Sequence, residues 1–437
     1  TYIQGYQNEK EELGEKQLQD TIEKLKQEYR KKDCVILYFT GLTESYEGEG
    51  YDRKNLKIPQ NQEELLAEIA ETVGKDHIAA ISFGGAPMDF SFEKNVGAIL
   101  HMYLGGQAVG ESVADLISGE VNPSGKLAET IPFSEKDTPA WRYFAPPNDD
   151  VEYRESIFVG YRYYETFHVP VKYPFGYGLS YTSFSYSELN VPEVYSGGKI
   201  QIRFKIKNIG KVSGAEIAQL YICPIESDVI RSHIELKGFQ KIYLHPGEEK
   251  EVILELDERS FSVYDVEKKA FSMLSGKYQI CIGASVHDLQ LKANMEVVGN
   301  SYFRNERELF PDYFREQPHG MEISAEQFYQ LLGGEPKHDK EKKRGEYTVY
   351  DSYQDVVNVS MFGKFVRGVV HIGLKIILRG KSERNPAFKM VKMGVEEGNL
   401  EGLIATSGGI ATPKLIDMLV YNANKKYLQA FKRLLKK

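Results

Sequence analysis

Four carboxylates lie within nine residues of one another in a single glycine-rich segment of the chain. A carboxylic acid can donate a proton to a leaving group and, once ionised, can take a proton from water, so carboxylates gathered in one loop are candidates for general acid/base catalysis. Gly48 and Gly50 flank one of them, Glu49, and give its backbone unusual conformational freedom. The segment is residues 41–59, GLTESYEGEGYDRKNLKIP, and its carboxylates are Glu44, Glu47, Glu49 and Asp52.

The alternative interpretation of this segment is a solvated acidic loop, because exposed runs of charge are usually inert. Its position favours chemistry. It follows a short apolar run, residues 34–39 (CVILYF), which is typical of a buried parallel strand. It precedes a segment in which Leu65, Leu66 and Ile69 recur at helical spacing. We therefore expect a loop that leaves the carboxyl end of a strand.

Strand and helix patterns alternate over the first third of the chain. Residues 14–32 and 106–118 have the periodicity of helices, and residues 77–83, 96–103 and 126–131 are short runs typical of strands. This alternation predicts an α/β domain with an open parallel sheet and helices on both faces. In such sheets ligands bind beyond the carboxyl ends of the strands, where the acidic loop is expected.

A different pattern begins after an aromatic, proline-containing connector over residues 133–182. In KIQIRFKIKN, Ile200, Ile202 and Phe204 alternate with polar residues, as in a half-buried strand. Several short strands of this kind, separated by turn residues, predict an all-β, immunoglobulin-like sandwich.

The C-terminal part of the chain is basic and helical in pattern. Residues 301–350 are charged and irregular, which is typical of a solvated linker. Residues 352–378 are predicted to form one helix with an apolar and a basic side. The basic side suits a membrane surface. Docking of the apolar side on the rest of the protein is the favoured alternative, so we expect no membrane contact. A last helix is predicted to begin at Thr412, its N-cap, with Pro413 in the first turn.

Composition and motifs exclude several classes of function. The 437 residues carry a net charge of −8, which argues against a nucleic-acid partner. No zinc-binding or serine-hydrolase motif occurs, and the glycines of residues 105–110 fit no nucleotide-binding spacing, so we expect no metal and no cofactor. Three cysteines without a disulfide framework favour a cytoplasmic location. Because the chain starts at Thr1, within what resembles a strand, the natural N-terminus is expected upstream and the location stays open.

Four stretches of the chain together resemble glycoside hydrolase family 3, and specifically its C-terminal α/β sandwich domain. They occur in the order that the family has them. One departure is Phe92, where many members have a tryptophan. The stretches are EGEGYDRKNLKIP (47–59), GGQAVGESVADLISGEVNPSGKLAETIP (105–132), FVGYRYYET (158–166) and YPFGYGLSYTSFSYSEL (173–189).

The resemblance extends beyond this domain. The stretch HIELKGFQKIYLHPGEEKEV (233–252) resembles the fibronectin type III-like domain that follows in many members, and residues 385–409 resemble extensions of some bacterial β-glucosidase-like members. The expected domains are a partial α/β sandwich domain with connector (1–182), a fibronectin type III-like domain (183–300), a charged linker (301–350) and a helical extension (351–437).

Members of the family are retaining exo-acting β-glycosidases, so the resemblance implies hydrolysis of β-glucosides or oligosaccharides (EC 3.2.1.-, in particular 3.2.1.21). It implies a nucleophilic Asp on a TIM-like barrel domain and an acid/base Glu on the sandwich domain. Matching the family's Glu-Gly-Tyr-Asp-Arg onto residues 49–53 assigns the acid/base role to Glu49. Glu47 is the second choice because loop length varies. Tyr51, Asp52 and Arg53 are then expected to bind substrate or to hold the loop, Asp52 and Arg53 as an ion pair.

The nucleophile is expected to be absent from this chain. The only tryptophan is Trp141, in Pro-Ala-Trp-Arg, so the Ser-Asp-Trp motif of the family's nucleophile does not occur. A retaining mechanism needs two carboxyl groups about 5–5.5 Å apart, and the chain supplies one of them. We therefore expect the chain to be inactive alone and to act with a barrel domain of the same parent protein. The alternative is a non-catalytic carbohydrate-binding or assembly module.

Overall fold

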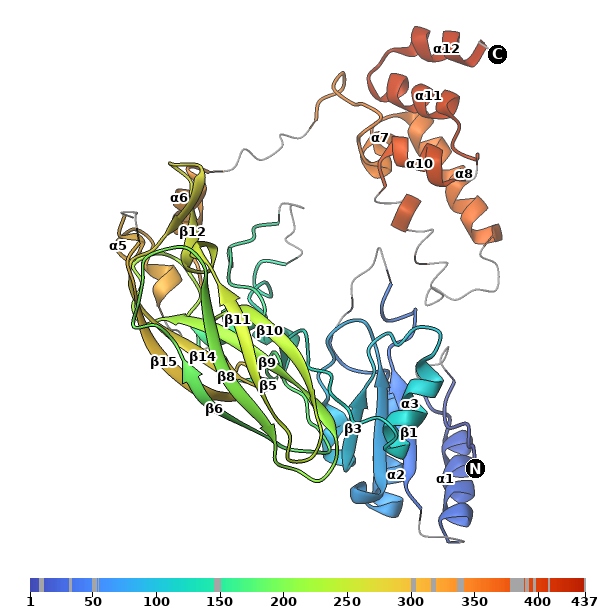
Figure 1. The fold of residues 1–437 in the computed structure, drawn as a ribbon. Coiled ribbons are helices and arrows are strands. Elements are labelled where there is room, and N and C mark those ends of the chain that lie inside the picture. The colour runs from blue at the N-terminus through green and yellow to red at the C-terminus, as the bar shows by residue number, and fades with distance from the viewer. Residues whose placement is uncertain are drawn as a thin grey trace.

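The computed structural model has an α/β unit, a β-sandwich and a group of C-terminal helices (Figure 1). Glu49, Tyr51 and Asp52 lie outside the described residues. The structure describes residues 1–7, 12–30, 34–48, 53, 55–144, 151–299, 304–315, 320–335, 342–377, 389, 393–395, 398–407 and 409–435.

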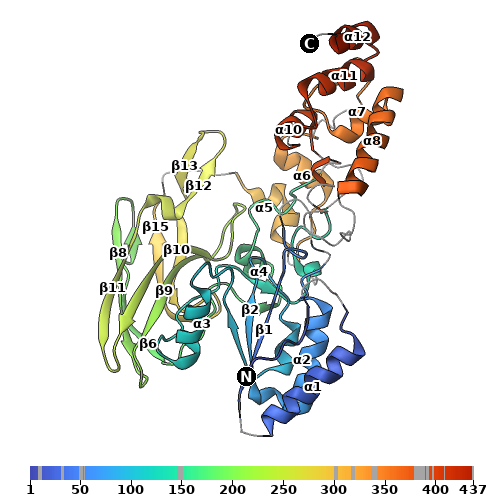
Figure 2. The same cartoon turned by 90° about the vertical axis from the view of Figure 1, so that its right-hand side faces the viewer.

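The α/β unit consists of β1 (Ile36–Gly41), β2 (Ile78–Phe83), β3 (Ala98–His101), α1 (Glu15–Tyr29), α2 (Gln60–Val73) and α3 (Val109–Ser118). The three strands form a parallel sheet in the order β1-β2-β3. Figure 2 shows α1 and α2 on one side of this sheet and α3 on the other. The predicted parallel sheet with helices on both faces is therefore confirmed.

The apolar side of α2 covers the sheet as its spacing predicts. Leu65, Leu66 and Ile69 are buried in one core with Tyr38 of β1 and Ala80 of β2. Side chains alternate across a strand, so the neighbours of Tyr38 face the other way. On that other face β1, an edge strand, is exposed to solvent: Leu37 and Phe39 are 41% and 49% exposed. The expectation that this strand is buried is correct for one face and wrong for the other, because α3 buries only Val113.

The strand expected at residues 126–131 is reduced to β4 (Ile131–Pro132), which pairs antiparallel with β5 (Val171–Tyr173). Leu127 bonds instead to a turn of the connector: its N–H donates to the carbonyl of Tyr177, and its carbonyl accepts the N–H of Gly176, both at 2.8 Å. This segment therefore joins the connector and does not extend the three-stranded sheet.

A buried amide on α2 fixes the end of β1. Gln62 is 1% exposed, and its Oε1 accepts the N–H of Gly41 at 2.9 Å and the hydroxyl of Thr40 at 2.6 Å. Its Nε2 donates to the carbonyl of Gly41 at 3.1 Å. The last residue of β1 thus has both backbone groups satisfied by one side chain, at the point where the acidic loop begins.

The connector forms a second core with residues from beyond the sandwich. Its helix α4 (Tyr161–Thr166) and the later helices α5 (Glu306–Leu309) and α6 (Ala325–Leu332) frame this core. Phe158 of the connector packs with Phe310 and Tyr313, each 1% exposed. Residues 304–315 and 320–335 thus differ from the solvated linker that their charge predicts, because their few aromatic side chains are spaced to pack on the connector.

Two sheets face each other in the sandwich, and all of their strand pairs are antiparallel except β15 with β7, which is parallel. Their orders are β10-β9-β14-β15-β7 and β11-β8-β6, with a β12-β13 hairpin beside them. The residues that alternate in the sequence, such as Ile202 and Phe204, are buried between the sheets. The strands are β6 (Phe184–Asn190), β7 (Val194–Tyr195), β8 (Ile200–Asn208), β9 (Gly214–Pro224), β10 (Glu235–Leu244), β11 (Glu249–Leu256), β12 (Ser262–Asp265), β13 (Ala270–Met273), β14 (Gly276–Gly283) and β15 (Leu289–Val297).

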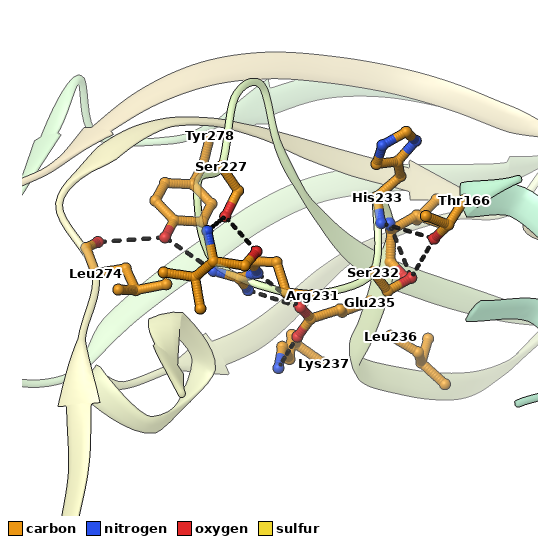
Figure 3. A network of polar contacts seen from close by, with 12 residues as sticks. Thr166, Ser227, Arg231, Ser232, His233, Glu235, Leu236, Lys237, Leu274 and Tyr278 are labelled. Carbon is orange, nitrogen blue, oxygen red and sulfur yellow. Dashed lines mark hydrogen bonds and ion pairs between the residues drawn. The ribbon is translucent and has the colours of Figure 1, made fainter. Parts of the chain in front are cut away.

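A polar network joins the sandwich to the connector (Figure 3). Arg231, whose side chain is 2% exposed, donates to Glu235 Oε1 at 2.7 and 3.0 Å and to the hydroxyl of Tyr278 at 3.0 Å. Thr166 of α4 accepts the N–H of His233 at 3.1 Å. Burial raises the pKa of Glu235, but Arg231 and a neighbouring lysine outweigh this effect, so the pKa lies below its usual range.

The C-terminal helices have a core of their own, which includes Val356, Val366 and Leu419. The single helix predicted over residues 352–378 is divided into two, because Ser360 Oγ accepts the N–H of Gly363 at 2.9 Å and starts a new helix. The N-cap predicted at Thr412 is confirmed. The helices are α7 (Tyr353–Asn358), α8 (Met361–Ile377), α10 (Leu400–Thr406), α11 (Pro413–Ala423) and α12 (Tyr427–Leu435).

Replacing Gln62 tests the amide that fixes β1. Gln62→Leu keeps the size of the side chain but leaves the buried N–H and carbonyl of Gly41 unpaired, so we expect a loss of about 2–4 kcal/mol in unfolding free energy. Gln60→Leu is the control, because Gln60 is exposed, and we expect a change within about 0.5 kcal/mol. Urea unfolding measures both, and hydrogen exchange at Gly41 should accelerate only in Gln62→Leu. Equal stability of the two variants would contradict this role.

Replacing Arg231 tests the polar network. Arg231→Met leaves a buried carboxylate without its main partner, and we expect a loss of about 3 kcal/mol at pH 7. Because the pKa of Glu235 is depressed in the folded state, the contribution of the pair is present above the unfolded pKa and is lost as the pH falls through the folded pKa. The difference between wild type and variant should therefore shrink below about pH 4.

The matched control is Arg203→Met, because Arg203 pairs with Glu251 across two strands at the surface, at 3.0 Å. We expect it to cost less than about 1 kcal/mol. Thermal and urea unfolding between pH 3 and pH 7 measure these differences. A difference for Arg231→Met that did not depend on pH would show that Glu235 is not the group involved.

Candidate functional site

Three loops leave the same edge of the parallel sheet. Residues 42–59 follow β1, residues 84–90 follow β2 and residues 102–108 follow β3. All three therefore start at the carboxyl ends of strands, where an open α/β sheet binds its ligands. The acidic segment singled out in the sequence is the first of these loops.

Glu47 ties the acidic loop to the loop after β2. Both of its carboxylate oxygens accept the backbone N–H of Gly85, at 2.9 and 3.0 Å. Glu47, the second choice for the acid/base residue, thus has a structural contact that holds the loop against the sheet edge.

Arg53 makes a second tie to the same neighbouring loop. Its Nη1 donates to the carbonyl of Pro87 at 2.7 Å. Burial lowers the pKa of Arg53, and the carboxylates of Glu47 and Asp89 act in the opposite direction. Its Nε is buried without a hydrogen-bond partner among the residues that the structure describes. The expected ion pair with Asp52 stays a prediction, because Asp52 lies outside those residues, as do Glu49 and Tyr51.

The end of β3 carries a polar cluster that the sequence analysis missed. The Nδ1 of His101 lies 3.0 Å from the hydroxyl of Ser82, and burial lowers the pKa of His101 to about 4, so the ring is neutral near pH 7. Burial also raises the pKa of Glu129, and burial next to Glu129 raises the pKa of Tyr103. The sequence does place Ser82 and His101 near the ends of two predicted strands, but it does not show that their side chains lie together.

A cavity of about 580 Å³ lies between this edge of the α/β unit and the connector. Leu56 and Pro87, from the first two loops, line it together with Glu129 and Arg162. This volume is within the range of small-molecule sites. Because burial raises its pKa, Glu129 is a second carboxyl group at this edge that must be separated from Glu49 by experiment.

Lys389, from the C-terminal part of the chain, donates to the carbonyl of Ser45 in the acidic loop at 2.7 Å. Over the described ranges, no three His, Cys, Asp or Glu side chains are grouped so that they could hold a metal ion.

Comparison with known proteins gives the family. Residues 1–181 match the family model of the glycosyl hydrolase family 3 C-terminal domain, and residues 216–286 match a fibronectin type III-like domain. The chain is 41% identical over 298 residues to "Thermostable beta-glucosidase B" of Acetivibrio thermocellus, covering 68% of this chain and 38% of that protein. It is 37% identical over 273 residues to "Exo-alpha-(1->6)-L-arabinopyranosidase" of Bifidobacterium breve, covering 62% of this chain and 36% of that protein.

The fold agrees with these matches. The crystal structure of a family 3 beta-glucosidase from Bifidobacterium adolescentis has a TM-score of 0.63 at 35% identity, covering 68% of this chain and 43% of that one. The chain thus spans about two fifths of the length of the relatives it matches. Residues 1–181 are thus a C-terminal domain of glycoside hydrolase family 3, and a fibronectin type III-like domain follows over residues 216–286.

Proposed function

We propose that this chain supplies the acid/base carboxylate, Glu49, of a retaining exo-β-glycosidase of the β-glucosidase type. The nucleophilic Asp and most of the sugar-binding residues would come from a barrel domain of the same parent protein. The substrate class is a β-glucoside or a short oligosaccharide with a β-linked non-reducing unit. The names of the relatives include a glucosidase and an arabinopyranosidase, so the glycosyl unit itself is left open.

The observation that carries this proposal is that Glu49 lies between two anchors. Glu47, two residues before it, is bonded to Gly85, and Arg53, four residues after it, is bonded to Pro87. Both anchors attach the loop to the same neighbouring loop, at the carboxyl edge of the sheet. A short glycine-flanked stretch between two fixed points is well suited to present one side chain across a domain boundary.

The anchors also support the choice between the two glutamates. The carboxylate of Glu47 is engaged with a backbone N–H of its own domain. An acid/base catalyst must instead reach the glycosidic oxygen, within hydrogen-bond distance of the substrate. Glu47 therefore acts as a positioning residue in this proposal. Arg53 does the same, and the proposed role of Tyr51 and Asp52 is to bind substrate or to position the loop.

The proposed reaction has two steps. In the first, protonated Glu49 gives its proton to the glycosidic oxygen as the bond to the leaving group breaks and the Asp of the barrel forms the glycosyl-enzyme bond. In the second, ionised Glu49 takes a proton from water as that water attacks the anomeric carbon and releases the Asp. The net result is hydrolysis with retention of configuration.

Substitution of Glu49 in a protein that joins this chain to a barrel domain tests the assignment. Glu49→Gln should lower kcat/KM for glycosides with poor leaving groups by about 10²–10⁴, the usual contribution of a general acid. Dinitrophenyl glycosides, which need no protonation, should be affected much less in the first step. Added azide, a nucleophile that needs no base, should speed the second step and yield a glycosyl azide.

Two matched variants serve as controls. Glu47→Gln keeps an oxygen that can accept the N–H of Gly85, so its effect should be small and independent of the leaving group. Glu129→Gln tests the other carboxyl group with a raised pKa. If either control, and not Glu49→Gln, shows the dependence on leaving group and the azide effect, the acid/base residue is that one and the assignment fails.

The alternative function is a non-catalytic module that binds carbohydrate or assists assembly. The absence of a Ser-Asp-Trp motif from the sequence favours it.

For either function, we expect the 437-residue chain by itself to release no p-nitrophenol from p-nitrophenyl β-D-glucoside above the level of a Glu49→Gln control. Turnover by the isolated chain that Glu49→Gln abolishes would show that the chain carries its own nucleophile. If the chain is a non-catalytic module, calorimetry should instead show that it binds an oligosaccharide and that Glu49→Gln does not change this binding.

A further inference from the structure

α8 presents two apolar faces. Phe362, Val366 and Val370 pack into the core of the C-terminal helices. A second set of large apolar side chains on the same helix stays exposed to solvent. Its members follow one another at helical spacing and are Met361, Phe365, Val369, Ile372 and Ile376.

The exposed set forms a continuous stripe with a basic border. At 100° per residue its five side chains fall within an arc of about 80° on the helix surface. Lys364, His371 and Lys375 lie next to this arc on one side, and the packed face lies on the other. No Asp or Glu occurs between residues 361 and 377.

The charge of the surrounding unit has the same sign. Residues 342–437 contain 18 Lys or Arg and 8 Asp or Glu, whereas the whole chain has 55 and 63. The basic and apolar pattern recurs on α12, where Lys432 accompanies a second exposed apolar set. That set consists of Tyr427, Leu428, Phe431, Leu434 and Leu435.

We propose that α8 lies on the surface of an anionic phospholipid bilayer, with its exposed stripe in the boundary between head groups and acyl chains. A helix with an apolar stripe bordered by lysines binds this boundary through apolar burial and through attraction to anionic head groups. The helix lies in the surface and does not span it: within the described ranges, no helix is both long and apolar enough to cross a membrane.

A second copy of this chain fits the stripe less well. Antiparallel pairing of two identical stripes about a twofold axis would bring the bordering lysines of both copies towards one another, at a cost in repulsion. An anionic surface instead supplies the opposite charge. The docking of α8 on its own protein, which the sequence favoured, accounts for the packed face only.

Binding of the full 437-residue chain to vesicles tests the proposal. We expect co-sedimentation with vesicles of phosphatidylcholine and phosphatidylglycerol in equal parts, weakening as salt is raised, and little binding to pure phosphatidylcholine. Phe365→Ser combined with Ile372→Ser should lower the partition coefficient about hundredfold, because each of the two side chains accounts for about tenfold. Lys364→Glu combined with Lys375→Glu should lower it at least thirtyfold, because two attractive charges are lost and two repulsive charges are added.

Matched controls separate this surface from others on the protein. Phe239→Ser removes a phenylalanine of the same exposure, 66% against 67%, from the sandwich, and Lys211→Glu with Lys241→Glu makes the same change of net charge there. These variants should bind as the wild type does. No binding to anionic vesicles, or binding that the α8 variants leave unchanged, would overturn the proposal. A concentration-dependent dimer in sedimentation that Phe365→Ser abolishes would overturn it in favour of a second copy.

Discussion

The acidic loop has to leave the buried end of a strand, and the side-chain amide of Gln62 is what makes that exit possible. Gly41, the last residue of β1, has a φ of +152°, and a Cβ at this position would lie 2.1 Å from the carbonyl oxygen of Phe83. Only glycine fits, and its buried N–H and carbonyl must then find partners. Gln62 supplies both. The hydrogen bond from the N–H of Gly85 to Glu47 depends on the contacts of Gln62 with Gly41. It joins the loops after β1 and β2, and those contacts fix where the first loop starts.

The sequence predicts the parts of this arrangement that depend on local pattern. The three strands, the covering helix α2 and the position of the acidic loop follow from apolar spacing and glycine content. The contacts that hold the loop do not, because Glu47 and Gly85 are 38 residues apart and nothing in either segment indicates the other. Gln62 was missed for a related reason. In the sequence, a glutamine among the apolar positions of a helix looks like a polar residue at the edge of the buried face. Its role as a hydrogen-bond partner is recognised only when the backbone N–H and carbonyl of Gly41 are known to need partners.

Composition and periodicity predict structure less well where a few side chains decide whether a segment packs or where a helix ends. Residues 304–335 are charged on average, yet Phe310 and Tyr313 are enough to attach them to the connector. The helix predicted over residues 352–378 has an apolar pattern that continues through its break. The break is set by Ser360, which caps α8, and by Gly363, where a Cβ would lie 2.4 Å from the carbonyl oxygen of Val357. Periodicity measures burial along a segment, and it carries no information on such close approaches.

The two faces of α8 also show what a hydrophobic pattern cannot predict. A helix that packs one arc and exposes another has apolar residues over more than half of its circumference, so a hydrophobic count cannot say how many partners it has. The structure separates the arcs, because Val366 is buried and Phe365, the next residue back, is exposed. Charge then restricts what can cover the exposed arc. Residues 1–341 contain 37 Lys or Arg and 55 Asp or Glu, so an anionic surface that attracts the C-terminal helices repels the rest of the chain. A bilayer that binds α8 would therefore attract the helical extension and repel the acidic remainder of the chain, so charge alone favours contact through the extension.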